Sequence, residues 1–331
     1  MNKKEEFIYR LSKDNDTTAI VELLKICLGD NDNRTNEYWE WKHNNNPFGK
    51  SFVMLAFDKD LLIGVRSFMR WEWSKKSYIY KCVRCVDTVV HPNYRRRGLF
   101  SIMTLKGLEI MKNEGVDFVF NTPNSKSLPG NLKMGWKEYG NTGLKVRINN
   151  LVKSLYYRVA KSEFSADLIN EEHILNNLST NYLADFISQS IQDESVLRKR
   201  ISSDYLIWRY LDVPTHKYGV FIDSQDRFLI FFRLNKRGKM RELRICDIIM
   251  KSVDEKAIKK AIKLLMNQYY VDLATLTGDN DFTFKSLANK VGFVSVGNRG
   301  LTMVLREVNT PIDKFLNRDC WGYTSGDIEL F

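Results

Sequence analysis

The sequence has no hydrophobic run of about 18 residues, the length that a membrane-spanning helix needs. Its first residues, MNKKEEFIYR, also lack the apolar core of a secretory signal peptide. The five cysteines are few and odd in number, which fits a reducing compartment better than a disulfide framework. We therefore expect a cytoplasmic protein with no membrane span.

The usual sequence patterns for metal and nucleotide binding are missing as well. The four histidines have no metal-ligand spacing. Cys82 and Cys85 form a CxxC, but they fall on an expected strand, where residues three apart point to opposite faces. We predict no metal site. Neither GxxxxGK[ST] nor GxGxxG occurs, so the P-loop and the dinucleotide-binding fingerprint are excluded.

The charge balance is basic, with 51 lysines and arginines against 40 acidic residues and a net charge of +11. The basic residues are spread along the chain, and no helix-turn-helix, zinc-finger or RNP motif appears. We expect no nucleic-acid partner. The excess positive charge instead favours small anionic ligands, which it would steer toward the surface.

Residues 91–101, HPNYRRRGLFS, place three arginines and a glycine between two apolar segments. The preceding run, Val83–Val90, is rich in β-branched residues and predicts a buried strand, while residues 101–115 have apolar residues at helical spacing. The N–H groups at a helix N-terminus bind anions, and Gly98 has no Cβ to keep a phosphate from the backbone. The stretch therefore predicts a pyrophosphate site.

This stretch resembles motif A of the GNAT acyltransferase superfamily, Arg/Gln-x-x-Gly-x-Gly/Ala. The first four positions match, and Phe100 replaces the usual small last residue. Residues 118–140, FVFNTPNSKSLPGNLKMGWKEYG, resemble the next family segment, which has a strand, an asparagine, a short helix and Lys-x-Gly-aromatic. The resemblance covers about the first 150 residues, and it implies acetyl-CoA as the cosubstrate.

The chain also repeats itself, and the matching blocks keep their order. A block rich in tyrosine and tryptophan, the predicted strand before the basic loop, and the Lys-x-Gly segment each occur twice. The pairs are Tyr38–Ile63 with Tyr205–Ile230, residues 83–90 with 243–250, and residues 133–144 with 290–301.

The second copy has KSVDEKAIKKA where the first has HPNYRRRGLFS, so Asp254 and Glu255 stand where a phosphate would bind. We predict an α/β fold of two tandem GNAT-like units, each a mixed β-sheet flanked by helices, with the second unit degenerate. The expected boundaries are residues 1–150 for the GNAT domain with the acetyl-CoA site, 151–180 for a helical connector, and 181–331 for the degenerate domain plus a C-terminal tail.

The resemblance also implies which residues hold the cosubstrate. Main chain of Val89 and Val90 would pair with the pantetheine amides, and Asn124 would contact the cofactor arm. The pyrophosphate would lie on the basic loop and the first turn of the helix. The residues assigned to that part of the site are Arg95, Arg96, Arg97, Gly98, Leu99, Phe100 and Ser101.

The catalytic groups follow the family pattern less well. Many GNAT enzymes carry a tyrosine, the acid for the departing thiolate, at the position of Asn131, which cannot act as that acid. Asp87 on the expected fourth strand is a candidate base. Asp247 repeats it in the copy without a cosubstrate site, which favours a structural role. The terminal carboxylate of Phe331 is the other candidate, since some tandem GNAT acyltransferases fold their chain end into the active site.

These features predict an acetyl-CoA-dependent N-acetyltransferase that acts on a small-molecule amine. The segment Trp39–Pro47, with Trp321 and Asp327 in the tail, is similar to GNAT proteins associated with bacterial polysaccharide assembly, which points to an amino sugar as acceptor. Two alternatives stay open. One is an aminoacyl-tRNA-dependent tandem-GNAT transferase, which needs no intact pyrophosphate loop, and the other is a non-catalytic adaptor that binds CoA.

Overall fold

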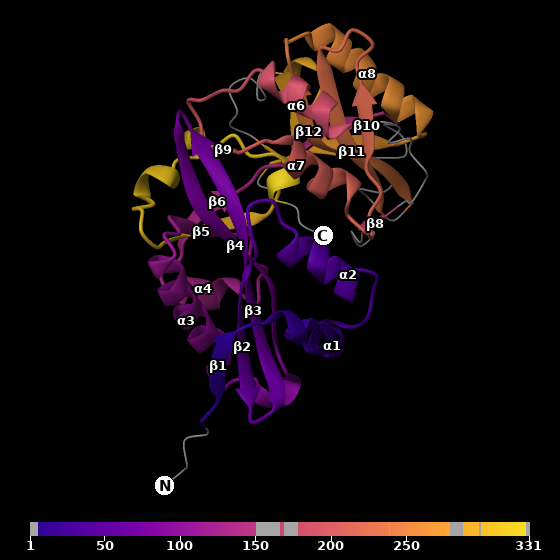
Figure 1. The fold of residues 1–331 in the computed structure, drawn as a ribbon. Coiled ribbons are helices and arrows are strands. Elements are labelled where there is room, and N and C mark those ends of the chain that lie inside the picture. The colour runs from indigo at the N-terminus through magenta and orange to yellow at the C-terminus, as the bar shows by residue number, and fades with distance from the viewer. Residues whose placement is uncertain are drawn as a thin grey trace. The chain divides into compact units, whose positions relative to one another are not determined.

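The computed structural model describes residues 6–149, 166–168, 178–237, 239–278, 287–297 and 299–328. The chain forms two compact α/β units, and each has its own mixed sheet (Figure 1). The first unit comprises residues 1–140 and 302–317, and the second comprises residues 141–301 and 318–331. Within the described ranges, no helix is both long and apolar enough to span a bilayer.

The sheet of the first unit has the strand order β1-β2-β3-β4-β5-β15-β6. Strands β1 to β4 are antiparallel neighbours, β5 is parallel to β4, and β15 is antiparallel to β5. The strands are β1 (Ile8–Leu11), β2 (Phe52–Asp58), β3 (Leu61–Lys75), β4 (Tyr78–Val90), β5 (Phe118–Asn121), β6 (Lys137–Asn141) and β15 (Thr302–Glu307).

Helices cover both faces of this sheet, with α1 and α2 on one side and α3 and α4 on the other (Figure 1). Helix α1 buries Ile20, Val21 and Leu24 against the sheet, and α3 buries Met103 and Met111. The elements are α1 (Thr17–Leu28), α2 (Asn36–Trp39), the π-helix η2 (Glu40–Asn44), α3 (Leu99–Asn113), α4 (Leu128–Lys133), and the 3₁₀ turns η1 (Asp14–Asp16), η3 (Pro92–Tyr94) and η5 (Asp313–Phe315).

The sheet of the second unit has the order β10-β11-β12-β13-β7-β14, with β8 paired to β11. Apolar residues of α8, such as Ile258 and Ile262, pack on β11 and β12 in one core. The strands of this sheet are β7 (Lys145–Ile148), β8 (Ala166–Leu168), β10 (Gly219–Ile222), β11 (Phe228–Arg237), β12 (Met240–Met250), β13 (Leu273–Leu276) and β14 (Val294–Ser295). The short strand β9 (Arg198–Lys199) is not part of it. The helices are α6 (Thr180–Ser188), α7 (Ser203–Leu206), the π-helix η4 (Ile207–Leu211), α8 (Glu255–Gln268), the 3₁₀ turn η6 (Arg318–Cys320) and α10 (Ser325–Ile328).

The units do not follow the contiguous boundaries expected from the sequence. Strand β7 precedes the predicted connector, yet it pairs with β13 of the second unit, and β15 near the chain end pairs with β5 of the first. Backbone hydrogen bonding therefore exchanges one strand between the two sequence repeats. Most of the predicted helical connector, residues 150–165 and 169–177, lies outside the described residues, and the part between them is strand β8 rather than helix.

The two repeats form the same local structure, a short α-helix that continues into a π-helix, at corresponding positions. Helix α2 continues into the π-helix η2, and α7 continues into η4, at positions that the sequence repeat aligns. The sheet registers correct one part of the alignment. Gly64 lies opposite Val90 and Phe228 lies opposite Met250, so Phe228 is the counterpart of Gly64 and not of Leu61. The matches of Leu62 with Leu229 and of Ile63 with Ile230 are therefore coincidental.

Candidate active site

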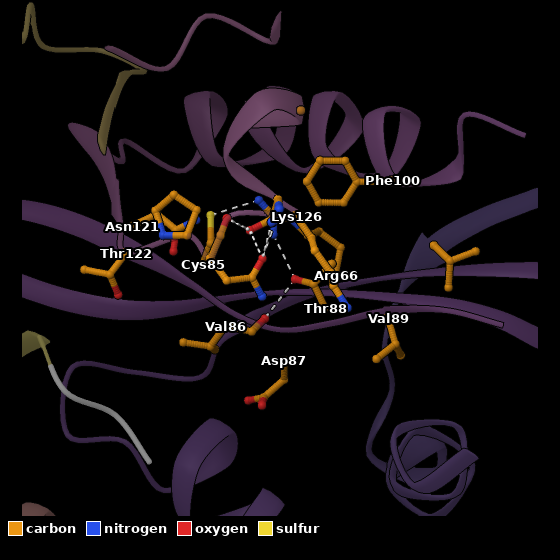
Figure 2. A pocket seen from close by; sticks show the side chains of 15 residues that line it. Arg66, Cys85, Val86, Asp87, Thr88, Val89, Phe100, Asn121, Thr122 and Lys126 are labelled. Carbon is orange, nitrogen blue, oxygen red and sulfur yellow. Dashed lines mark hydrogen bonds between the residues drawn. The ribbon is translucent and has the colours of Figure 1, made fainter. Parts of the chain in front are cut away.

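A pocket of about 440 Å³ opens in the first unit where β4 and β5 separate. The parallel pairing ends with Arg84 opposite Phe120, whereas β4 continues to Val90. Figure 2 shows the lining side chains along β4 and the facing segment after β5. Of the residues predicted from the sequence, the pocket brings together Asp87, Val89, Val90, Phe100 and Asn124.

The basic loop lies between the end of β4 and the start of α3. Arg95, Arg96 and Arg97 are exposed, and Arg97 lies over the Tyr94 ring at 5.0 Å. Gly98 is the N-cap of α3 with a φ of 80°, a left-handed conformation that glycine adopts without steric cost. Among the described residues, no side chain caps this helix. Its first N–H groups are therefore placed to bind an anion, as the sequence predicts.

The first turn of α3 points its side chains in different directions. Leu99 is buried in the core with Met54 and Met103, so it can offer only its main chain to a ligand. Phe100 lines the pocket, and its ring contacts Gly130 of α4. The bulky residue at the last motif position thus forms one wall of the pocket. Ser101 follows on the same turn and is half-buried.

Asn124 has a structural role that the sequence did not suggest. Its Oδ1 accepts hydrogen bonds from the backbone N–H of Lys126 and of Ser127, each at 3.0 Å, and from the Ser127 hydroxyl at 3.1 Å. These bonds shape the turn that leads into α4 and place it against the pocket.

Asp87 sits at a β-bulge in β4. Val86 pairs with Ser67 and Thr88 pairs with Arg66, so Asp87 has no partner on β3, and its φ is 39°. A positive φ is strained for a residue with a side chain, and bulges of this kind re-aim a side chain out of the regular alternation. Figure 2 shows the Asp87 carboxylate pointing away from the side where Arg66 and Phe100 lie.

The π-helix η2 supplies two partners for the Asp87 carboxylate. Lys42 Nζ lies 2.7 Å and His43 Nε2 lies 2.9 Å from Asp87 Oδ2, while His43 Nδ1 lies 2.9 Å from Ser51 Oγ. Burial alone would raise the pKa of Asp87, but Lys42 and His43 outweigh it and hold the pKa well below its usual range. Burial lowers the pKa of His43, although Asp87 opposes this.

These shifts define the charge state of the cluster at neutral pH. Asp87 is an ionised carboxylate and His43 is a neutral imidazole, so His43 donates its Nε2–H to Asp87 and accepts at Nδ1 from the Ser51 hydroxyl. Sequence reasoning missed Lys42 and His43. The sequence repeat could have pointed to these two residues, because they align with Arg209 and Tyr210 in the matching block of the second copy.

Two other predicted positions behave differently. Asn131, which stands at the family's tyrosine position, is fully buried, and neither polar atom of its side-chain amide has a hydrogen-bond partner among the described residues. It is not among the residues that line the pocket. Phe331 lies outside the described residues. No cluster of histidine, cysteine, aspartate or glutamate in the described ranges is arranged to hold a metal ion.

Comparisons with known proteins agree with this fold. Residues 8–138 match the family model described as an acetyltransferase (GNAT) domain, which is the segment that contains the pocket and the basic loop. None of the curated proteins matches the chain by sequence. The segment that holds the pocket is therefore similar in sequence to a GNAT acetyltransferase domain.

Solved structures share the fold at low sequence identity. A GCN5-related N-acetyltransferase from Anabaena variabilis is 12% identical with a TM-score of 0.63, and the match covers 92% of this chain and 73% of that one. Eis1 from Mycobacterium abscessus is 13% identical with a TM-score of 0.58, covering 92% and 74%. N-myristoyltransferase from Saccharomyces cerevisiae, solved with myristoyl-CoA, is 11% identical with a TM-score of 0.52, covering 92% and 82%.

Proposed function

We propose that this protein transfers an acyl group, acetyl in the simplest case, from acyl-CoA to a small-molecule amine. The observation that carries the proposal is the pocket between the separating strands β4 and β5, which adjoins an uncapped helix N-terminus with a basic loop. A thioester with a long neutral arm and a pyrophosphate fits both features. The GNAT match of residues 8–138 and the myristoyl-CoA in the yeast neighbour support a CoA-type cosubstrate.

The chain's own residues divide the binding work. The N–H groups of Gly98 to Ser101 and the arginines of the loop would hold the pyrophosphate, and each such charge-assisted hydrogen bond contributes about 1.5–3 kcal/mol. Main chain of Val89 and Val90, which no strand covers on the β5 side, would pair with the amides of the arm. When bound, acyl-CoA supplies an acyl group activated as a thioester.

The reaction forms a C–N bond and breaks the C–S bond, and the amine loses one proton while the thiolate gains one. Asp87 is a weak base because Lys42 and His43 hold its pKa low. We assign it to anchoring these two side chains rather than to taking the proton. The terminal carboxylate of Phe331 stays a candidate for proton transfer, to be tested by deleting that residue.

The acceptor class rests on resemblance alone. We propose an amino sugar, but Trp41, Trp321 and Asp327, which carry the likeness to polysaccharide-assembly proteins, are all buried. A screen of amino sugars, polyamines and peptide amines with acetyl-CoA, read as release of free CoA thiol, would identify the acceptor. If none of the amines on that panel causes release of free CoA thiol, the proposal of a small-molecule acceptor is contradicted.

Thermal unfolding separates the three functions that the sequence left open. Stabilisation by acetyl-CoA and not by tRNA supports the acyl-CoA transferase, and stabilisation by tRNA alone supports the aminoacyl-tRNA alternative. Acetyl-CoA binding without turnover in the screen supports the adaptor. Calorimetry should also give one cosubstrate per chain, because the second unit has acidic residues in place of the basic loop. Two sites per chain would contradict that assignment.

A further inference from the structure

Arg66 of β3 is a buried cation that lines the pocket. Only 3% of the residue is exposed. Its Nη1 donates to Thr88 Oγ1 at 2.8 Å and its Nη2 donates to Cys85 Sγ at 3.1 Å (Figure 2). Its Nε has no hydrogen-bond partner in the part of the chain that the structure describes. No carboxylate among the described residues forms an ion pair with it.

This arrangement is unusual for a buried charge. A guanidinium stays protonated even where burial lowers its pKa, and an unpaired buried ion is strongly unfavourable. Three other buried cations each have a carboxylate partner, although Arg209 is held by the Gly326 carbonyl and the Tyr218 hydroxyl. Lys42 has Asp87, Lys199 has Asp247, and Arg244 has Glu242. Arg66 has instead a hydroxyl, a thiol and the rings of Phe68 and Phe100, at 5.1 and 4.9 Å.

The second unit shows that the fold does not need a cation at this position. The sheet registers make Ile230 the counterpart of Arg66, and Ile230 is fully buried in the apolar core around α8. An isoleucine thus occupies the same position in a sheet of the same kind. Because the arginine occurs in the unit that has the pocket, a ligand in that pocket is the expected partner of its charge.

We infer that Arg66 binds the free carboxylate of a short dicarboxylic acyl group, so that the preferred donor is of the succinyl-CoA type. This rests on the proposed function. The two β4 residues that Arg66 contacts, Cys85 and Thr88, flank the bulge at Asp87 and line the pocket with it. The loop and the α3 N-terminus already provide a place for the phosphates, which leaves the acyl group for Arg66.

The chemistry of the acyl group fits the pocket wall. A planar guanidinium with an unused Nε–H can bind a carboxylate through two parallel hydrogen bonds. A long apolar acyl chain would bury this charge without a partner, which disfavours it. The transfer step is unchanged, because the thioester carbon forms the C–N bond while the distal carboxylate stays as it is.

Calorimetry with succinyl-CoA, acetyl-CoA and CoA tests the inference. The wild-type protein should bind succinyl-CoA at least about tenfold more tightly than acetyl-CoA, which corresponds to about 1.4 kcal/mol. Arg66→Gln should remove this difference while retaining affinity for acetyl-CoA. The matched control is Arg70→Gln, on the same strand, where Arg70 lies over Phe52 and donates to Lys50 O; it should keep the preference. Arg66→Ile, which copies the second unit, is a second variant that we expect to fold.

Each outcome decides the question. Equal affinity for the two thioesters in the wild-type protein, or a preference that persists in Arg66→Gln and Arg66→Ile, overturns the inference and leaves the proposed function intact. An equal loss for all three ligands in the variants assigns Arg66 to the phosphates and also overturns it. If no CoA compound binds the wild-type protein, the proposed function fails as well.

Discussion

The sequence repeat aligns an aspartate of β4 with an aspartate of β12, but the surroundings of the two differ. Asp87 of β4 has a side chain that is 26% exposed and borders the pocket. Asp247 of β12 is 3% exposed and contacts Lys199, Tyr210 and Thr324. In the second unit the chain's own C-terminal segment closes the site. Gly326 of α10 lies against Tyr210 and Asp247 so closely that no larger residue fits.

The helices that follow these strands differ in the same way. The N-cap of α3 is Gly98, and no side chain of the described residues caps this helix. The N-cap of α8 is Asp254, whose carboxylate accepts from Ala257 N at 2.9 Å and pairs with Arg227 at 2.5 Å. The second unit therefore has a carboxylate of its own at this helix terminus, whereas the N-cap of the first is a glycine. This difference agrees with the proposal that the first unit binds an anionic ligand there and the second does not.

The largest effect should come from giving α3 the cap that α8 has. Gly98→Asp should weaken acetyl-CoA binding by about a hundredfold or more, because the new carboxylate repels the pyrophosphate at the helix terminus. Gly115→Asp is the matched control, since Gly115 also has a positive φ, of 71°, and open space around it, but lies at the other end of α3. Unchanged affinity of Gly98→Asp by calorimetry would contradict the site.

The two aspartates should differ in their contribution to stability. Asp247→Asn removes a carboxylate that pairs with the buried Lys199. We therefore expect a loss of about 3–5 kcal/mol in the free energy of unfolding. Asp87→Asn should cost less, about 1–3 kcal/mol, because its site is partly solvated. Denaturant unfolding measures both. Turnover per folded Asp87→Asn molecule should stay near normal, and a stable but inactive protein would show that Asp87 is catalytic.

His43 should make the stability of the first unit depend on pH. Tyr210, at the corresponding position, cannot do this in the second unit. The pKa of His43 is lowered in the folded protein, so the unfolded chain binds a proton first as the pH falls below about 6.5. Stability should decrease from pH 7 to 5, by at most about 1.4 kcal/mol per pH unit. His43→Gln should flatten this slope in thermal unfolding. An equal slope in the two proteins would exclude His43 as its source.

The smallest effect should come from the rim of the basic loop. Arg97 is exposed, so Arg97→Ala should weaken acetyl-CoA binding by about threefold to tenfold, and the difference should shrink at high salt. Lys106→Ala is a control that removes one charge from α3 near Tyr9, away from the loop. A loss that is equal in both variants would indicate general charge attraction rather than a specific phosphate contact.

The local parts of the site could be predicted from the sequence. The strand before the loop, the glycine at the helix start and the helix after it depend on neighbouring residues, and the structure has them as β4, Gly98 and α3. The repeat also predicted two sheets of the same kind. The repeat alignment was wrong for β3 and β11, whose observed registers shift relative to it. Strand register is set by packing and hairpin geometry and not by residue identity.

By itself, the sequence determined an α/β chain with one basic loop at a helix N-terminus and a second copy in which acidic residues replace that loop. Only the tertiary structure decided which residues surround the pocket. Backbone pairing puts Arg66 beside Cys85 and Thr88, and the π-helix brings Lys42 and His43 to Asp87 from distant segments. It also moves β15 into the first sheet. Such contacts depend on how strands pair and helices pack across the whole chain, and no local pattern of residues encodes them.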